Sequence, residues 1–418
     1  MPSIRSLRPA VSAFSTSDEL PHSLPGRGAH FGNVGYVGKG GVDTVTQYDC
    51  VIVGAGPAGS STAYHLARQG ATVLLLEQAA LPRPKPCTGA LSPRVAEWFD
   101  FDFAPALANT VRQVRYTWKL GDEIISELET QEPIWIVRRD TFDQFLAEQA
   151  IAQGATLHDQ TPVAGVEQVD GRWHIHTSRG TYQARYLVAA DGATGPMSGW
   201  LGLESAKPRA AAVLELPTPL PPDKAALNFE FGLLKSGCLW CFPRDRDTVM
   251  GGVTLLGKQT PNFEQTFATY AQDFDLTGGD CQVHPVRLWD GHRKLHTQQA
   301  LVVGEAAAIV DPLSAEGIRH GMYSGMKAAE AIAAALAGEP DALAGYTAAM
   351  HEWGDNMQWA QRIASVFFRV PGLGYRVGIK RPTMTKRMGQ LLAGEIQYSD
   401  IANRIIKRLT TGFIPGRS

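Results

Sequence analysis

The sequence predicts an α/β (α+β) fold: a helix-covered parallel sheet with an inserted antiparallel sheet and a helical C-terminal tail. Three observations predict it. A strand passes through a glycine-rich turn into a helix within residues 48–78, residues 205–295 alternate between apolar and polar side chains as strands do, and the basic C-terminal region has a helical pattern. The chain of 418 residues is long enough for two or three such substructures around a buried core.

The segment YDCVIVGAGPAGSSTAYHLARQGATVLLLEQ (48–78) carries the strongest local signal. An apolar strand at 50–53 enters the turn GAGPAG (54–59), a helix follows, and a second strand at 72–76 ends at Glu77. This complete strand–turn–helix–strand–acid unit is typical of a Rossmann-like domain that binds a dinucleotide.

The small residues of the turn each have a physical reason. Gly54 permits the tight turn, Gly56 lets a pyrophosphate approach the backbone, and Gly59 lets the helix pack closely on the strand. The helix N-terminus around Ala58 offers free N–H groups and the positive end of the helix dipole to phosphates. Glu77 lies 18 residues after Gly59, where an acid binds a ribose hydroxyl. FAD and NAD(P) share this ADP half, so the motif alone leaves the two cofactors open.

Two further strand–turn units lie downstream. RYLVAADGATG (185–195) delivers Asp191 and Gly192 to a turn, and ALVVGEAAAIVDPLSAEGIRHGMYSG (300–325) delivers Glu305 before a glycine-initiated helix. Together with the helical segment IVRRDTFDQFLAEQA, this set resembles the FAD-binding fold shared by para-hydroxybenzoate hydroxylase-like flavoproteins. The resemblance favours FAD and implies a Rossmann-like FAD-binding domain with an inserted antiparallel-sheet substrate domain.

The same resemblance implies roles for particular residues. Glu305 stands where the family usually has Asp, and this carboxylate would grip the ribityl chain. The helix beginning at Gly317-Ile318 would point its N-terminus at the O2 side of the flavin, where it stabilises negative charge. Arg139 matches the family's flavin-proximal arginine. Val163 completes the cofactor-binding residues that we expect in this part of the chain.

Three stretches resemble the geranylgeranyl reductase family, flavoenzymes that saturate isoprenoid double bonds. KPCTGALS (85–92) is similar to that family's KxCGG segment, and EGIRHGMYSGMKAAEAI (316–332) is similar to its flavin helix. GCLWCFPRDRDTVMGGV (237–253) is similar to its GYxWxFPK segment followed by a glycine-rich strand. The resemblance covers about residues 47–335 and implies reduction of an isoprenoid substrate.

The first of these stretches adds Cys87, Thr88 and Ala90 to the expected cofactor-binding residues. The chain departs from the family pattern in this stretch and in the third. Thr88 replaces the first glycine of KxCGG, Cys238 stands where the family has Tyr, and Arg244 stands where it has Lys. The change at Cys238 predicts a substrate pocket of altered shape.

Reduction of such an alkene makes chemical demands on the pocket. An unactivated trisubstituted double bond must be protonated as hydride arrives, so positive charge builds on a tertiary carbon. Aromatic faces stabilise a desolvated cation by ~2 kcal/mol or more, and Trp240 and Phe242 alternate onto one face of a strand. A thiol with a pKa of ~8.5 is too weak an acid to act alone, so we expect Cys87 to face the flavin, shape the pocket and join a proton relay. The expected catalytic residues are therefore Cys87, Trp240 and Phe242; a purely structural role of the two aromatics in the sheet core is the alternative.

These elements predict a division of the chain into four parts. They are a disordered leader (1–46), an FAD-binding domain (47–90, 135–204 and 296–340), a substrate-binding sheet domain (91–134 and 205–295) and a helical basic C-terminal region (341–418). The leader is rich in Ser, Gly, Pro and Arg and has no apolar stretch, which argues against a secretory signal. A transit peptide and a start codon placed upstream of the true one are both open.

Composition excludes several classes of protein and partner. A net charge of −2 argues against a nucleic-acid partner, and five scattered cysteines indicate a reducing compartment without a disulfide framework. We expect no metal, because CLWC (238–241) has no second pair of ligands. No apolar run reaches the ~20 residues that span a bilayer. We therefore expect a cytoplasmic protein, or a plastid protein if the leader is a transit peptide.

The C-terminal region has a charge of its own. Residues 361–418 contain eleven Lys and Arg against two acids, and the segment IANRIIKRLTTGF is apolar on one helical face and basic on another. This pattern suits a peripheral membrane contact, which a lipid-soluble substrate needs. A helical tail packed on the protein core is the alternative.

The predicted function is that of an FAD-dependent oxidoreductase that reduces carbon–carbon double bonds of a geranylgeranyl or other polyprenyl chain in pigment, quinone or lipid biosynthesis. The chain has no second GxGxxG motif, so we expect electrons from NADPH bound transiently in a cleft or from reduced ferredoxin. The alternatives are an FAD-dependent aromatic-ring monooxygenase and a non-catalytic flavin- or isoprenoid-binding protein. The KxC and WxFP stretches favour the reductase.

Overall fold

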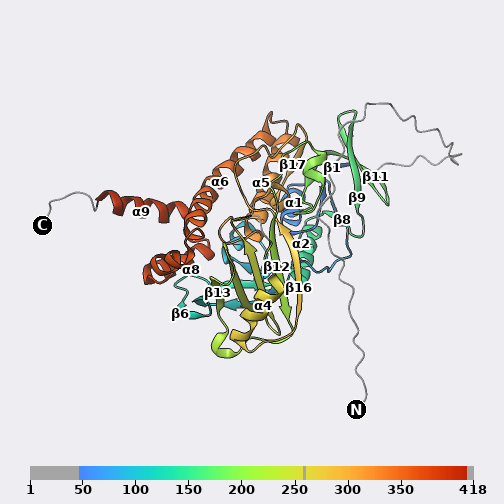
Figure 1. Ribbon diagram of the computed structural model, residues 1–418. Coiled ribbons are helices and arrows are strands. Elements are labelled where there is room, and N and C mark those ends of the chain that lie inside the picture. Colours follow the sequence, from blue (N-terminus) through green and yellow to red (C-terminus); the bar gives the residue numbers. More distant parts are fainter. Residues whose placement is uncertain (1–46, 258–259, 412–418) are drawn as a thin grey trace, which may run out of the picture. The chain divides into compact units, whose positions relative to one another are not determined.

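A computed structural model describes residues 47–257 and 260–411 (Figure 1). Within them the chain forms two seven-stranded sheets, a three-stranded sheet and surrounding helices, which confirms the predicted α/β class. The predicted leader and residues 412–418 lie outside the described residues.

The first sheet has the strand order β8-β2-β1-β11-β10-β9, and β17 also pairs with β11. Its strands are β1 (Gln47–Val53), β2 (Val73–Leu76), β8 (Thr156–His158), β9 (Val163–Val169), β10 (Arg172–Thr177), β11 (Gly180–Ala189) and β17 (Ala300–Val302). The pairs β1–β2, β1–β11, β2–β8 and β11–β17 are parallel. The carboxyl ends of these strands therefore meet at one edge of the sheet, where α/β folds bind ligands.

Four helices pack on or beside this sheet: α1 (Pro57–Arg68), α2 (Arg139–Ala152), α5 (Ile318–Leu336) and α6 (Ala342–Phe367). Small residues let α1 and α5 approach closely, because a Cβ at Gly325 would overlap the carbonyl oxygen of Ala58. The hydroxyl of Ser61 donates to the carbonyl of Met322 at 2.8 Å across the same contact. This packing fixes the N-termini of both helices at the same edge of the sheet.

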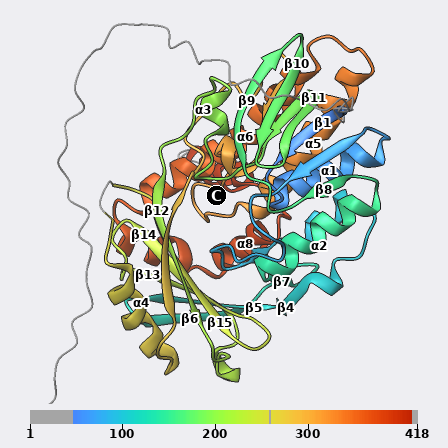
Figure 2. The same ribbon diagram turned by 90° about the vertical axis from the view of Figure 1, so that its right-hand side faces the viewer.

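The second sheet has the order β16-β12-β15-β14-β13-β5-β6, and Figure 2 shows its long strands side by side. Its strands are β5 (Gln113–Trp118), β6 (Gly121–Glu127), β12 (Arg209–Leu216), β13 (Leu227–Phe231), β14 (Gly237–Pro243), β15 (Thr248–Thr254) and β16 (Asp280–Val286). Neighbours are antiparallel except β13 and β5.

Side chains of β14 alternate between two cores. Leu239 and Cys241 pack against α4 (Phe263–Ala271), whereas Cys238 and Phe242 pack into the core on the other face. The two cysteines of CLWC therefore point away from each other, and the face that carries Phe242 is turned toward the interior of the molecule.

The third sheet has the order β3-β7-β4, with β3 (Ala90–Leu91), β7 (Ile134–Val137) and β4 (Leu107–Val111). The remaining helices are α3 (Met197–Trp200), α7 (Pro371–Gly374), α8 (Pro382–Leu392) and α9 (Tyr398–Thr411), and a π-helical turn spans Tyr375–Ile379. Short 3-10 helices are Pro93–Trp98, Ala104–Ala106, Pro222–Lys224, Gln272–Phe274 and Gly304–Ala307. Among the described residues, none of the helices combines the length and apolar character needed to cross a bilayer.

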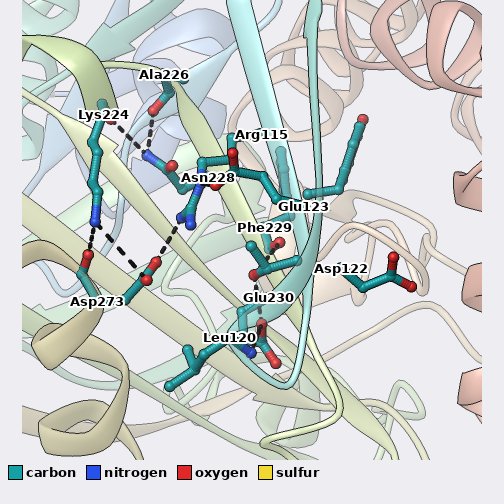
Figure 3. Close-up of polar contacts among 12 residues, drawn as sticks. Arg115, Leu120, Asp122, Glu123, Lys224, Ala226, Asn228, Phe229, Glu230 and Asp273 are labelled. Carbon is teal, nitrogen blue, oxygen red and sulfur yellow. Dashed lines mark hydrogen bonds and ion pairs between the residues drawn. The ribbon is translucent and has the colours of Figure 1, made fainter.

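A cluster of polar side chains connects strands of the second sheet with neighbouring segments (Figure 3). The buried guanidinium of Arg115 pairs with Glu123 and, at 2.7 Å, with Asp273. Lys224 also pairs with Asp273, and the side-chain amide of Asn228 donates to backbone carbonyls, among them that of Ala226 at 2.8 Å. These contacts connect the segment before β13 and the 3-10 helix Gln272–Phe274 with β5.

Candidate functional site

A cavity of about 580 Å³ lies at the carboxyl ends of β1, β2 and β11. This volume lies in the usual range for a small-molecule or cofactor site. The predicted cofactor-binding residues that line it are Gly54, Gly56, Ala58, Glu77, Cys87, Thr88, Arg139, Val163, Asp191, Gly192, Glu305, Gly317 and Ile318. Residues more than 250 positions apart in the sequence therefore meet around one space.

The glycine turn has the backbone that its sequence predicts. Gly54 has a φ of +107°, and a Cβ there would overlap the carbonyl oxygen of Ala190. A Cβ at Gly59 would overlap the carbonyl oxygen of Gly54, so Gly59 serves the packing of α1 on β1 and does not line the cavity. At Gly56 the nearest atoms to a Cβ would be guanidinium nitrogens at 3.9 Å, which leaves this backbone open to the cavity.

Glu77 is held beside the glycine turn. Its carboxylate accepts the N–H of Ala55 at 3.0 Å and the N–H of Ala79 at 3.1 Å, and it pairs with Arg83 at 3.1 Å. The side chain is almost fully buried. This position, at the end of β2 and on the cavity wall, is the one expected for an acid that binds a ribose hydroxyl.

Two arginines share one buried carboxylate next to the turn. Asp143 pairs with Arg139 at 2.7 Å and with Arg83 at 3.0 Å, and its side chain is fully buried. Burial alone lowers the pKa of Arg139, but Asp143 and a hydrogen bond with Cys87 outweigh burial and raise it. Both guanidiniums face Gly56, so they can bind phosphate there. Arg83 was not predicted, although it lies in the basic loop PRPKPC.

Another part of the cavity wall carries a buried polar atom that lacks a partner. Oδ1 of Asp191, which lines the cavity, is buried without a hydrogen-bond partner among the described residues. Nε and Nη1 of Arg287 also lack partners among these residues; Arg287 follows Val286 of the cavity wall but does not itself line the cavity. Burial raises the pKa of Asp191, and it also raises that of Glu305, against the opposing charges of Lys85 and Arg287. Unpaired buried donors and acceptors are costly, and a ligand rich in hydroxyl and phosphate groups satisfies both kinds. The residues present therefore fit FAD. Lys85 is the lysine of the KxCGG-like stretch but was not predicted as a site residue, and Arg287 belongs to no recognised motif.

A second, smaller cavity of about 80 Å³ adjoins the first. Both cavities are lined by Cys87, Thr88, Trp240, Ala315, Gly317 and Ile318. The second cavity is otherwise lined mainly by apolar side chains, among them Ala90, Ile134, Leu227, Phe229, Phe242 and Leu392. The three predicted catalytic residues thus meet at this cavity, with Cys87 and Trp240 at its boundary with the larger one.

Trp240 has a fixed orientation. Its indole N–H donates to the hydroxyl of Thr88 at 2.7 Å. A Cβ at Gly251 on the neighbouring strand would overlap the indole and approach Thr88. The replacement of a family glycine by Thr88 therefore has a structural consequence in this chain, since Thr88 holds the ring that separates the two cavities. Gly251 lies in the glycine-rich strand but was not predicted as a site residue.

The other departure in this region does not reach the cavities. Cys238 lies in the core on the same face of β14 as Phe242, lines neither cavity, and burial raises the pKa of its thiol to about 12. The expectation that the change from Tyr to Cys238 alters the shape of the pocket therefore stays a prediction, since Cys238 shares a strand face with Trp240 and Phe242. Arg244 is likewise buried and pairs with Glu215 and Asp247.

One acid on the wall of the second cavity was missed by sequence reasoning. Glu316 precedes α5 and pairs bidentately with Arg319, at 3.0 and 3.1 Å. Burial raises the pKa of Glu316, Arg319 lowers it, and Asp311 raises it further. Among the described residues that line this cavity, Glu316 is the one that carries a carboxyl group.

Matches to known families agree with this geometry. Residues 47–216 match the family described as FAD binding domain, and residues 132–337 match the family described as FAD dependent oxidoreductase. The fold, the site and these matches define the class: the chain is an FAD-dependent oxidoreductase, as its sequence predicted.

Named proteins with similar sequences point to a smaller group within the FAD-dependent oxidoreductases. The chain is 29% identical over 313 residues to digeranylgeranylglycerophospholipid reductase 1 of Methanothermobacter thermautotrophicus, covering 70% of this chain and 78% of that protein. It is 28% identical over 311 residues to the digeranylgeranylglycerophospholipid reductase of Methanococcus vannielii, covering 69% and 78%. These relatives support the resemblance to the geranylgeranyl reductase family that the motifs predicted.

Solved structures share the fold. A geranylgeranyl bacteriochlorophyll reductase-like protein of Thermoplasma acidophilum superposes with a TM-score of 0.67 and 23% identity, covering 77% of this chain and 87% of that chain. A flavin-dependent brominase superposes with a TM-score of 0.66 and 21% identity, covering 88% and 100%. Because proteins with such different names share this fold, the fold alone does not select the reaction.

Proposed function

We propose that the chain reduces carbon–carbon double bonds of a geranylgeranyl or other polyprenyl chain. The observation that carries the proposal is the second cavity, which is apolar and shares its wall with the cofactor cavity. Its volume of about 80 Å³ lies far below the ~300–1,000 Å³ of a complete ligand pocket. It therefore suits one short reactive segment of a long apolar chain. The names of the relatives support an isoprenoid lipid as the substrate class.

The cavity walls suit the charge that develops on the alkene. When bound, FAD supplies hydride chemistry in the larger cavity. Trp240 and Phe242 present aromatic faces to the second cavity, and the ring of Phe229 lies 5.5 Å from that of Phe242. These faces exclude water and stabilise a desolvated carbocation-like centre. Phe242 also belongs to the sheet core, so its position is fixed by packing.

One proton must reach the alkene for each hydride. The cavity wall offers Cys87 and Glu316 for this purpose. Cys87 lies at the boundary of the two cavities and contacts Arg139, which lies between the thiol and the buried Asp143. Cys87 alone is too weak an acid for an alkene, so we assign it to a relay that passes a proton into the pocket, with Glu316 as the second titratable member.

The electron donor stays a prediction. NADPH bound transiently or reduced ferredoxin both fit a chain with a single glycine-rich dinucleotide motif. Chemical reduction of the purified protein makes the test of the reaction independent of this choice.

The product of a single turnover tests the proposed reaction. Protein reconstituted with FAD is reduced by dithionite without oxygen and mixed with a geranylgeranyl glycerophospholipid in detergent. Mass spectrometry should show a lipid heavier by two hydrogen atoms for each reduced bond. An unchanged lipid, combined with oxygen uptake when NADPH and an aromatic acid are supplied, would identify the chain as a monooxygenase instead.

A further inference from the structure

Three of the most exposed apolar side chains lie close together in sequence, where α6 ends. Val366 is 76% exposed, Val370 57% and Leu373 58%. Of the eight large apolar residues that are exposed in the described part of the chain, the other five lie singly elsewhere. Val366 lies in the last turn of α6, Val370 lies in the short connection just before α7, and Leu373 follows in α7. Single exposed apolar residues are ordinary, but a group of them marks an interaction surface.

The same segment is positively charged. The sequence contains no Asp or Glu between Asp355 and Glu395. Some of its cations have acidic partners elsewhere in the structure. Lys380 pairs with Asp122 and Lys386 pairs with Glu129, so their charges are compensated.

Four other cations in this segment are exposed and have no ion-pair partner among the described residues. Arg362 hydrogen-bonds Gln358 at 3.2 Å and lies over the ring of Trp359. The other three are Arg369, Arg376 and Arg381. They lie before and after Leu373 in the sequence. The surface thus combines protruding apolar side chains with uncompensated positive charge. We call Val366, Arg369, Val370, Leu373, Arg376 and Arg381 the α6–α7 patch.

We propose that the α6–α7 patch is the surface by which this protein binds an anionic lipid membrane. Apolar side chains that protrude beside arginines fit the boundary between acyl chains and anionic head groups. A folded protein partner would instead be expected to cover a flat apolar area with fewer charges at its centre. The patch differs from the C-terminal segment expected from sequence, because the first turns of α9 are used in packing: Tyr398 and Ile401 are buried against α6.

The position of the patch relative to the second cavity supports this proposal and rests on the proposed function. Phe367, next to Val366, packs on Phe231 with ring centroids 5.3 Å apart. Phe231 contacts Tyr116, and Tyr116 stacks on Phe229 at 5.6 Å. Phe229 lines the second cavity. One apolar core cluster therefore connects Phe367, beside the patch, with residues that line the candidate alkene site.

Vesicle binding tests the patch directly. Holoprotein is sedimented with vesicles of phosphatidylcholine alone and with vesicles that also contain phosphatidylglycerol, at low and high salt. The wild type should bind the anionic vesicles, and less at high salt because exposed charges are screened. The triple variant Arg369→Gln, Arg376→Gln, Arg381→Gln should lose about 100-fold in partitioning at low salt, at about 1 kcal/mol for each arginine. The triple variant Val366→Ser, Val370→Ser, Leu373→Ser should also bind more weakly, and this loss should persist at high salt.

Matched controls separate the patch from general surface effects. Arg112→Gln, Arg179→Gln, Lys207→Gln removes three exposed cations elsewhere, and Ile125→Ser, Val283→Ser removes exposed apolar side chains elsewhere. Both controls should bind as the wild type does. FAD content and turnover of a short prenyl substrate in detergent should be unchanged in the patch variants. Failure of the proposed reaction would show in that turnover assay and leave vesicle binding intact.

Three results would overturn the proposal. The patch variants could bind anionic vesicles as tightly as the wild type. Removal of residues 404–418 alone could abolish binding, which would place the contact in the C-terminal segment. Alternatively, the wild type could fail to bind vesicles while the apolar patch variant converts a dimer to a monomer in light scattering, which would make the patch an interface between two copies.

Discussion

At the residue scale, the hydrogen bond between Trp240 and Thr88 determines how the two cavities meet. Thr88 comes from the loop after β2 and Trp240 from β14, and Gly251 leaves room for the ring. This pair explains why a threonine is tolerated where the family has glycine. A substitution of Thr88 can therefore test the importance of the orientation of Trp240 while the indole ring itself is kept.

The Thr88→Val variant keeps the shape of the side chain and removes the hydroxyl that accepts the hydrogen bond from the indole N–H of Trp240. We expect FAD content to remain, while substrate-dependent reoxidation of the reduced flavin slows by about 10-fold, since a lost hydrogen bond costs about 1–1.5 kcal/mol. Thr88→Ser should restore most of the rate because it keeps the hydroxyl. Stopped-flow absorbance measures both. Equal rates in Thr88→Val and the wild type would show that the indole needs no anchor.

The roles of Cys87 and Glu316 in proton delivery can be tested with one variant of each residue. Cys87→Ser replaces the thiol by a much weaker acid, and Glu316→Gln removes a titratable group but keeps its size. Each variant should slow flavin reoxidation by the isoprenoid while reduction of the flavin by dithionite stays normal. Glu316→Gln should also flatten the pH dependence of reoxidation. A normal pH profile in Glu316→Gln would limit this residue to its ion pair with Arg319.

At the element scale, the turn between β5 and β6 depends on a buried carboxylate. Lys119, Leu120 and Asp122 have positive φ angles of 53°, 61° and 51°, which is unusual for residues with a side chain. The carboxylate of Glu230, fully buried on β13, accepts the N–H of Lys119 at 2.9 Å and that of Leu120 at 3.2 Å. The strained turn is thus held by a residue more than 100 positions away.

Glu230→Gln replaces one acceptor oxygen by a donor amide that faces backbone N–H groups. We expect it to lower the free energy of unfolding by about 1–3 kcal/mol, as measured by urea denaturation. Glu264→Gln, on the exposed side of α4, serves as the matched control and should change stability little. Equal stabilities of both variants and the wild type would show that the turn does not rely on this carboxylate.

Helix α1 contains a titratable residue that couples stability to pH. His65 packs against Phe99, with ring centroids 4.8 Å apart, and burial, helped by the nearby Arg68, lowers its pKa to about 4. The unfolded chain binds a proton near pH ~6.5, whereas the folded chain does so only near pH 4. The contribution of His65 is therefore complete above pH ~6.5 and is lost as the pH falls toward 4.

The variant His65→Gln removes this titration. When the pH is lowered from 7 to 4, the Tm of this variant should fall less than the Tm of the wild type, because the variant lacks the histidine. The Tm should still fall in both proteins, because other groups titrate in both. Parallel curves for the two proteins would mean that His65 is accessible to protons in the folded state.

At the scale of the whole molecule, the local motifs predicted more than the long-range contacts. The glycine unit of 54–59 and the start of α5 at Gly317-Ile318 appear where the sequence places them, because their spacing is set within one strand–turn–helix unit. The contacts of Thr88 with Trp240 and of Arg83 with Asp143 join distant segments. No local pattern encodes such contacts.

Exposure is the other property that the sequence pattern did not reveal. The charge count of the C-terminal region includes cations that are paired with distant acids, such as Lys380 with Asp122. It also cannot show that Val366 and Val370 face outward, since close neighbours in the sequence such as Ala364 and Phe368 are buried. Only the packed arrangement of α6, α7 and the second sheet separates these groups.

The central claim is that an isoprenoid double bond accepts electrons at the wall between the two cavities. The rate of anaerobic reoxidation of the reduced, FAD-loaded protein tests it most directly, with a geranylgeranyl lipid and its fully saturated counterpart compared at equal concentration. We predict rapid, saturable reoxidation with the unsaturated lipid and none with the saturated one. Equal reoxidation by both lipids, or by neither in protein that reoxidises normally with oxygen, would contradict the claim.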